Sequence, residues 1–313
     1  MNLSMLLINA KTVAEKIQPT FKVFGITIHF YAIFMVLALS LCAVAAYFLF
    51  KRKNIKPELI IDVMIWVVPC SIVGARTWYV LMEIQDFVTN GWLDWKEVFN
   101  IMGGGLAIHG GVMGGAIGLL ISSKIAKINM PKLFDVGATL LPLGQAIGRW
   151  GNFFNQEVYG RPTTVTWFPF SVYIERTGSY HYALFFYEML CSLALLAFLL
   201  FFFYRYDGKR DLYSTGFYLM GYGVIRAIME PFRAQEFQMG AGIPKSVYTA
   251  IAMFIIGATV FGIVLYKDIK DKNYWWKEFF KKKEKIQTQT STASEQNSEV
   301  AVEIENIQDK KED

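Results

Sequence analysis

The chain has 313 residues, of which 54% are hydrophobic, 16% aromatic and only 18% charged. Soluble proteins usually carry about 25% charged residues, and here the charges cluster in short blocks between long apolar runs. This composition excludes an ordinary soluble protein and predicts an all-α polytopic membrane protein. The formal net charge of +5 therefore does not indicate a nucleic-acid partner, and we expect none.

Seven stretches are apolar and long enough to suggest membrane-spanning helices, which need about 20 residues each. They cover residues 24–50, 59–82, 101–123, 133–150, 182–204, 214–231 and 246–266. The third stretch is unusual because residues 101–118 contain eight glycines, which allow close helix contact or an irregular backbone. The sequence thus predicts about seven transmembrane helices.

Lysine and arginine between these stretches predict the orientation of the chain. The loops after the first, third, fifth and seventh stretches hold most of the positive residues, and such loops stay in the cytoplasm. We therefore expect the N-terminus outside the membrane and the C-terminus in the cytoplasm. The first 22 residues lack the apolar core and cleavage site of a signal peptide.

Four segments lie outside the predicted helices. Residues 1–23 form an extracytoplasmic N-terminal segment, and residues 151–181 form an extracytoplasmic loop rich in Thr, Trp, Phe and Tyr, which predicts a small cap of strands. Residues 267–284 are basic and aromatic, as expected of an interfacial segment. Residues 285–313 are polar and predict a disordered cytoplasmic tail.

The three cysteines, Cys42, Cys70 and Cys191, all fall within apolar stretches and are far apart in the sequence. This placement predicts buried small side chains. We expect no disulfide, no metal site and no cofactor. Asp135 opens the fourth stretch, where a carboxylate favours a helix N-terminus, so we assign it a structural role.

Polar residues inside the predicted helices gather towards their outer ends. They are Tyr31, Arg76, His109, Arg149, Tyr222, Arg226 and Glu230. An arginine at the centre of a bilayer costs at least ~2.5 kcal/mol, so such residues need a reason to be there. Three arginines with a histidine suit an anionic headgroup, because guanidinium groups bind phosphate oxygens in a bidentate manner.

Structural roles would also explain these residues one by one. Arg226 and Glu230 are four positions apart and can neutralise each other on one helix face. Arg76 can extend to the outer headgroups. His109 can donate to a backbone carbonyl, and Tyr31 and Tyr222 can be interfacial aromatics.

One motif carries a resemblance to a known family. The sequence GRWGNFFNQEVYG, residues 148–160, resembles the motif of prolipoprotein diacylglyceryl transferases at every fixed position. Other segments are similar to the family's in the same order along the chain: IHFYAIF at 28–34, GARTWYVLME at 74–83, GGLAIHGGVMGG at 104–115 and YGVIRAIMEPFR at 222–233. The family often carries His-Pro before its fifth helix, whereas this chain has HYALFFYE.

The resemblance implies a transferase with a catalytic domain at residues 24–266, acting at the outer leaflet of a bacterial plasma (inner) membrane. It would move the diacylglyceryl group of phosphatidylglycerol to the lipobox cysteine of a prolipoprotein and release glycerol phosphate. His109 is then the candidate base that removes the thiol proton. Tyr31 or Tyr222 would share this role. Arg149 and Arg226 would neutralise the leaving phosphate.

The remaining site residues are expected to bind substrate. Asn152, Asn155 and Glu157 would hold the headgroup hydroxyls, or fix the loop and orient Arg149. Gly160 would allow close backbone approach, and Arg76 and Glu230 complete the set. The alternative to a transferase is a lipid binder or exporter that binds phosphate with the same arginines. Such a protein would carry charge along a path through the membrane, whereas here the charge stays near one end.

Overall fold

The structure is a computed structural model, and it describes residues 9–89, 92–101, 104–205, 210–234 and 245–274, apart from the side chains of Ile26, His109 and Lys245. The chain divides into a unit that ends at Val264 and a second unit from Leu265 onwards. The first unit contains every site residue considered below. The predicted tail and most of the interfacial segment at 267–284 lie outside the described residues.

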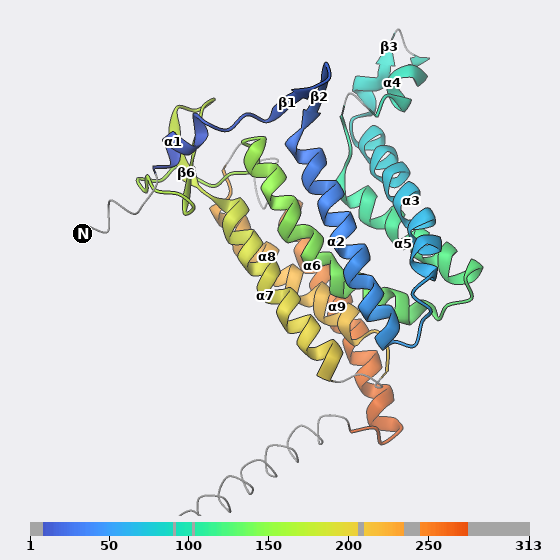
Figure 1. Cartoon of the computed structure of the whole chain (residues 1–313). Helices are drawn as coiled ribbons and strands as arrows, with labels where there is room; N and C mark the ends of the chain where they lie inside the picture. Colours follow the sequence, from blue (N-terminus) through green and yellow to red (C-terminus); the bar gives the residue numbers. More distant parts are fainter. Residues whose placement is uncertain (1–8, 90–91, 102–103, 206–209, 235–244, 275–313) are drawn as a thin grey trace, which may run out of the picture. The chain divides into compact units, whose positions relative to one another are not determined.

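Each of the seven predicted stretches contains one long helix (Figure 1). These helices are α2 (Phe30–Arg52), α3 (Leu59–Met82), α5 (Ile108–Ile125), α6 (Met130–Phe154), α7 (Leu184–Arg205), α8 (Tyr213–Met229) and α9 (Lys245–Lys270). Within the described residues, α2, α3, α7 and Ser246–Lys270 of α9 are long and apolar enough to cross a membrane, and α5 is a shorter apolar helix. The prediction of an all-α polytopic membrane protein is confirmed.

Short elements connect the long helices. They are α1 (Ala10–Ala14), β1 (Thr20–Val23), β2 (Ile26–His29), η2 (Ile84–Phe87), β3 (Val88–Thr89), β4 (Trp92–Leu93), α4 (Trp95–Phe99), β5 (Ser171–Ile174), β6 (Ser179–Tyr182) and η3 (Glu230–Phe232). The strands form three antiparallel hairpins, including β1–β2 with Thr20 opposite His29 and β5–β6 with Ser171 opposite Tyr182.

Two predicted helix starts were wrong. The first stretch was expected to be helical from residue 24, but strand β2 runs to His29 and α2 begins at Phe30. The third was expected to be helical from residue 101, but α5 begins at Ile108, because Gly104 and Gly105 adopt positive φ angles of 92° and 75°. Hydropathy does not distinguish an apolar hairpin or an irregular apolar segment from the helix that follows it.

Helices α2, α6 and α7 lie side by side (Figure 1). A buried cluster that includes Leu49 of α2, Leu133 of α6 and Phe203 of α7 joins them near one end. A second cluster joins Ala138 of α6 to Leu199 of α7 and to α8. Because α6 contacts α2, α7 and α8, residues at its C-terminal end can reach several helices.

Glycines bring α3 and α5 into direct backbone contact. A Cβ atom added at Gly114 would clash with the carbonyl of Cys70, and one at Gly118 would lie 2.7 Å from the carbonyl oxygen of Trp66. Gly74 and Gly110 contact each other in the same way. Among the described glycines of this segment, which were expected to permit close contact or irregular backbone, some therefore do the one and some the other.

Asp135 has the structural role that the sequence predicted, but at a different helix. Its carboxylate accepts hydrogen bonds from Leu212 N at 2.7 Å and from Thr215 N and Oγ1 at 2.9 Å each. It thus satisfies backbone N–H groups at the start of α8, which have no partners within that helix. Because Asp135 lies near the start of α6, this contact joins the starts of α6 and α8.

The predicted cap of strands corresponds to the β5–β6 hairpin, against which α1 packs. Its core includes Tyr159, Val172, Ile174 and Phe185. His181 is only 4% exposed, and its Nδ1 lies 2.8 Å from the carbonyl oxygen of Gly160. His181 therefore holds the hairpin to the chain that leaves α6.

Candidate active site

The site begins in the last turns of α6. The motif at 148–160 was expected to form a loop from residue 151, but α6 continues to Phe154 and Asn155 is its C-cap. Arg149 and Asn152 are therefore held by helix geometry on one side of α6. The Nη1 of Arg149 donates to Asn152 Oδ1 at 3.2 Å.

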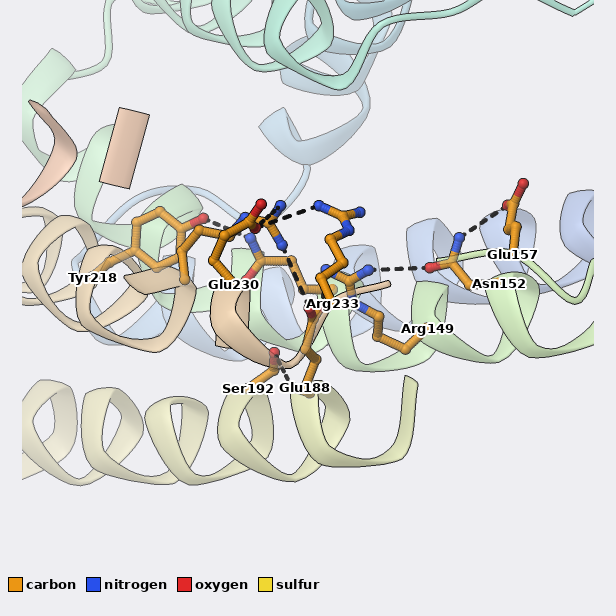
Figure 2. A network of polar contacts seen from close by, with 10 residues as sticks. Arg149, Asn152, Glu157, Glu188, Ser192, Tyr218, Glu230 and Arg233 are labelled. Carbon is orange, nitrogen blue, oxygen red and sulfur yellow. Dashed lines mark hydrogen bonds and ion pairs between the residues drawn. The ribbon is translucent and has the colours of Figure 1, made fainter. Parts of the chain in front are cut away.

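Glu188 of α7 lies next to Arg149 (Figure 2) and also contacts Arg226 of α8. Its carboxylate forms an ion pair with Arg149 Nη2 and a second with Arg226 Nη1 at 3.4 Å. The Glu188 side chain is 5% exposed, and those of Arg149 and Arg226 are 18% and 15% exposed. Three helices thus contribute one charged residue each to a single buried contact.

The network continues from α8 into η3. Arg226 Nη2 pairs with Glu230 at 3.0 Å, as the spacing of four residues predicted, and Arg233 Nη1 pairs with the same carboxylate at 3.7 Å. Burial, followed by repulsion from Arg226, lowers the pKa of Arg233, while Glu188 and Glu230 act in the opposite direction. Among the described residues, three guanidinium groups thus share the carboxylates of Glu188 and Glu230.

Asn152 connects Arg149 to Glu157 (Figure 2), and Asn155 also contacts Glu157. Asn152 Nδ2 donates to Glu157 Oε1 at 2.9 Å, and Asn155 Nδ2 donates to the same oxygen at 3.4 Å. Gln156 and Val158, on either side of Glu157, have positive φ angles of 51° and 57°. For a β-branched residue such as Val158 this conformation is a genuine outlier, and the turn it forms keeps Glu157 beside Asn152.

Deeper along α6 and α8 lies a second polar pair. Gln145 Nε2 donates to the hydroxyl of Tyr218 at 2.9 Å. The ring of Tyr218 stacks on Tyr222 with a centroid distance of 5.8 Å. The predicted site residue Tyr222 therefore lies on α8 one turn before Arg226, next to the network.

Tyr31 lies against the motif helix. A Cβ atom at Gly151 would lie 2.5 Å from Cδ2 of Tyr31, so the absence of a side chain at Gly151 lets the ring reach α6. The Tyr31 side chain is 38% exposed. The structure thus brings Tyr31 against Gly151, which lies between Arg149 and Asn152 on α6.

Gly160 has a close-packed backbone. A Cβ atom there would lie 2.7 Å from Cβ of Tyr182 and 3.0 Å from the carbonyl oxygen of Phe232. The adjoining Arg161 N donates to Phe232 O at 2.8 Å. Gly160 therefore lets the chain after α6 pair with the segment that carries Arg233.

Arg76 lies apart from this network. It is 8% exposed, and its guanidinium donates to the backbone carbonyls of Glu97, Val98, Gly104 and Gly105. It also lies over the rings of Tyr79 and Phe87. These contacts tie the segment between α3 and α5 to the end of α3. His109 lies in the first turn of α5, and its side chain is outside the described part of the structure.

Sequence reasoning missed two members of the network, Glu188 and Arg233. Glu188 is the only acidic residue in the 22 residues of α7. The cost that singled out the arginines applies equally to a carboxylate in an apolar helix, so this signal was present in the sequence. Arg233 lies just beyond its predicted helix, where an arginine needs no special explanation.

Arginine forks held by buried carboxylates, next to an amide-rich turn, can bind an anion with several oxygens and neutralise charge that develops on it. Among the described residues, no group of three or more His, Cys, Asp or Glu side chains has the arrangement of a metal site. Fold and network together define a polytopic membrane protein in which arginines and carboxylates from several helices meet near the helix ends.

Comparison with known proteins gives the family. The profile of the prolipoprotein diacylglyceryl transferases matches residues 18–263, and the chain belongs to this family. Proteins named phosphatidylglycerol–prolipoprotein diacylglyceryl transferase are similar to it. The one from Finegoldia magna is 35% identical, with 77% of this chain and 92% of the relative aligned. Those from Streptococcus pneumoniae and Gloeobacter violaceus are 34% and 33% identical, with 80% and 75% of this chain and 94% and 87% of the relatives aligned. The resemblance read from the motif is confirmed.

Proposed function

We propose that this chain transfers the diacylglyceryl group of phosphatidylglycerol to the lipobox cysteine of a prolipoprotein, at the outer leaflet of the bacterial plasma membrane. The observation that carries the proposal is the pair of arginines, Arg149 and Arg226, held on either side of Glu188. The names of the relatives describe the same transfer.

In this reaction the cysteine sulfur attacks the glycerol carbon that bears the phosphate ester. A carbon–sulfur bond forms, the carbon–oxygen bond to phosphate breaks, and its electron pair stays on the phosphate oxygen. The thiol proton is lost to a base. The products are a thioether and glycerol phosphate, so the site must favour the thiolate and stabilise the negative charge of the leaving phosphate.

Arg149 and Arg226 are suited to the second task. Each already gives part of its donor set to Glu188, Asn152 or Glu230, and a guanidinium has five N–H donors in a fixed fork. The ion pairs hold both forks before substrate arrives, which lowers the entropic cost of binding a phosphate to their remaining N–H donors. Glu230 holds Arg226 in the same way, and Arg233 contacts the same Glu230 carboxylate.

Asn152, Asn155 and Glu157 support the headgroup glycerol. Glu157 is an acceptor for hydroxyl groups, and the two amides that bind it keep it near Arg149. We assign His109 as the base that removes the thiol proton, and Tyr31 or Tyr222 can share this role. The contacts of Gly160 support a positioning role, since they pair the chain after α6 with the segment that carries Arg233. Arg76 arranges the backbone before α5, the helix that carries His109.

The test uses purified protein in phosphatidylglycerol micelles with a lipobox peptide, and lipid labelled in its acyl chains. Wild type is expected to label the peptide, and a peptide with serine in place of the acceptor cysteine should stay unlabelled. Arg149→Ala and Arg226→Ala should each lower the rate by about 100-fold or more. Arg149→Lys and Arg226→Lys keep the charge without the fork and should retain more activity.

The His109→Gln variant decides whether a base is needed, with an expected loss of about 100-fold or more. A folded wild-type protein that binds phosphatidylglycerol but never labels the peptide would overturn the transferase and favour a lipid binder.

A further inference from the structure

Gln145 and Tyr218 form a polar pair that the transfer chemistry above does not use. Gln145 precedes Arg149 by four residues on α6, and Tyr218 precedes Arg226 by eight on α8. The two helices run in nearly the same direction, because Asp135 contacts Thr215 near their starts and Glu188 bridges their arginines near the ends. The pair therefore lies about one to two helical turns further into the bundle than the arginines.

This pair has an unused hydrogen-bonding group. Gln145 Nε2 donates to Tyr218 Oη, but Gln145 Oε1 is buried and has no hydrogen-bond partner within the described part of the chain. A buried polar atom without a partner is destabilising. Rotation of the amide about its last bond exchanges its oxygen and nitrogen, and the Tyr218 hydroxyl can then donate to Oε1. The amide NH₂ group would then be the one left for a ligand.

The surroundings limit what that ligand can be. Tyr218 is 5% exposed and packs in a cluster with Ala138, Leu195 and Leu199. A ligand at this level must therefore be mostly apolar, with isolated hydrogen-bond acceptors. The ester groups of a diacyl lipid fit that description, since each offers a carbonyl oxygen and no donor.

The depth of Gln145 below the arginines also matches the distance between the phosphate and the ester groups of the lipid. A phosphate bound by Arg149 and Arg226 is joined to the glycerol backbone and its two esters by a few covalent bonds. One helical turn is about 5.4 Å, so an ester carbonyl would lie near the level of Gln145. The apolar chains would continue along the bundle below it.

We propose that Gln145 donates a hydrogen bond to an ester carbonyl of the diacylglyceryl group, and that Tyr218 holds the amide in the orientation this requires. The inference rests on the proposed function, because it takes the phosphate to be bound by the arginines. Together the two contacts would fix both ends of the glycerol unit and so hold the carbon that the sulfur attacks.

The test compares ordinary diester phosphatidylglycerol with a dialkyl ether analogue, which has no carbonyls. Binding of each lipid is measured together with transfer, so that a lipid that binds without reacting still gives a result. Gln145→Met has nearly the same shape and lacks the amide. It should weaken use of the diester by about 2-fold to 10-fold and leave the ether analogue unchanged.

Two variants act as controls. Tyr218→Phe removes only the hydroxyl and should lower the preference for the diester in the same direction. Thr139→Val removes a buried hydroxyl on α6 that donates to Asp135 O at 2.7 Å, and it should affect both lipids equally. If Gln145→Met weakens both lipids equally, the residue is merely structural and the inference fails. The inference also fails if Gln145→Met changes the use of neither lipid. A wild-type protein that transfers neither lipid would instead overturn the proposed function.

Discussion

At the residue scale, the arginines are governed by Glu188. Three like-charged groups within one buried network would repel one another, and Glu188 and Glu230 are the carboxylates placed among them. Glu188 contacts guanidinium groups from two different helices, α6 and α8. Its position in an apolar helix thus has a physical reason.

We expect Glu188→Gln to destabilise the protein and to abolish transfer. The change leaves Arg149 and Arg226 without their shared counter-ion, and breaking a buried ion pair in this way costs about 3–5 kcal/mol. The measurement is the thermal unfolding midpoint in detergent, together with the transfer rate. Glu188→Asp keeps the charge on a shorter side chain, so its unfolding midpoint and transfer rate should lie between those of wild type and Glu188→Gln.

Glu175→Gln is the matched control, because Glu175 is exposed in the turn between β5 and β6. It should leave both stability and transfer unchanged. A Glu188→Gln protein as stable as wild type would show that the ion pairs contribute little to the fold.

At the element scale, two pairs of helices are joined by different means. Contact between α3 and α5 depends on glycine, which allows the backbones to approach closely. Contact between the starts of α6 and α8 depends on the Asp135 carboxylate. Each device can be tested by one substitution.

Gly114→Ala should push α3 and α5 apart, because the added methyl group would clash with the carbonyl of Cys70. We expect a lower unfolding midpoint in detergent. Gly262→Ala in α9 is the control, since a Cβ atom there meets nothing within 4 Å, and alanine is favoured over glycine in a helix by about 1 kcal/mol. Equal midpoints for both variants would contradict the close-contact interpretation.

Asp135→Ala should destabilise the protein by about 2–4 kcal/mol, because three hydrogen bonds of about 1 kcal/mol each are lost. Guanidinium or thermal unfolding in detergent measures the change. Asp62→Ala removes an exposed carboxylate from the first turn of α3 and should have little effect. An Asp135→Ala protein with the same unfolding midpoint as wild type would show that α8 does not need this contact.

At the scale of the whole molecule, the site lies where α6, α7 and α8 converge with the segment after η3. The positive residues of the loops place this end outside the cytoplasm, a prediction that chemical labelling can test. In a background without Cys42, Cys70 and Cys191, a cysteine at Glu175→Cys should react in intact cells with a membrane-impermeant maleimide. A cysteine at Lys56→Cys should react only after the cells are opened, and the reverse pattern would invert the proposed orientation.

Several features were determined by the sequence itself. Long apolar runs predicted the seven helices, because the cost of placing polar backbone and charge in lipid acts on each segment separately. The motif at 148–160 identified the family, since its fixed residues are adjacent in the chain. The spacing of Arg226 and Glu230 was enough to predict their ion pair, because a helix sets that distance.

Tertiary structure alone decided which distant residues meet. Arg76 and Arg149 have the same chemistry and a similar place near a helix end, yet Arg76 binds four backbone carbonyls and Arg149 joins the network. Asp135 caps α8 rather than its own helix, and Glu188 joins two arginines from other helices. Hydropathy reports which segments leave water, but it does not specify how each helix is rotated or which neighbour it packs against. Those contacts depend on packing between segments far apart in the chain, so only the folded molecule defines them.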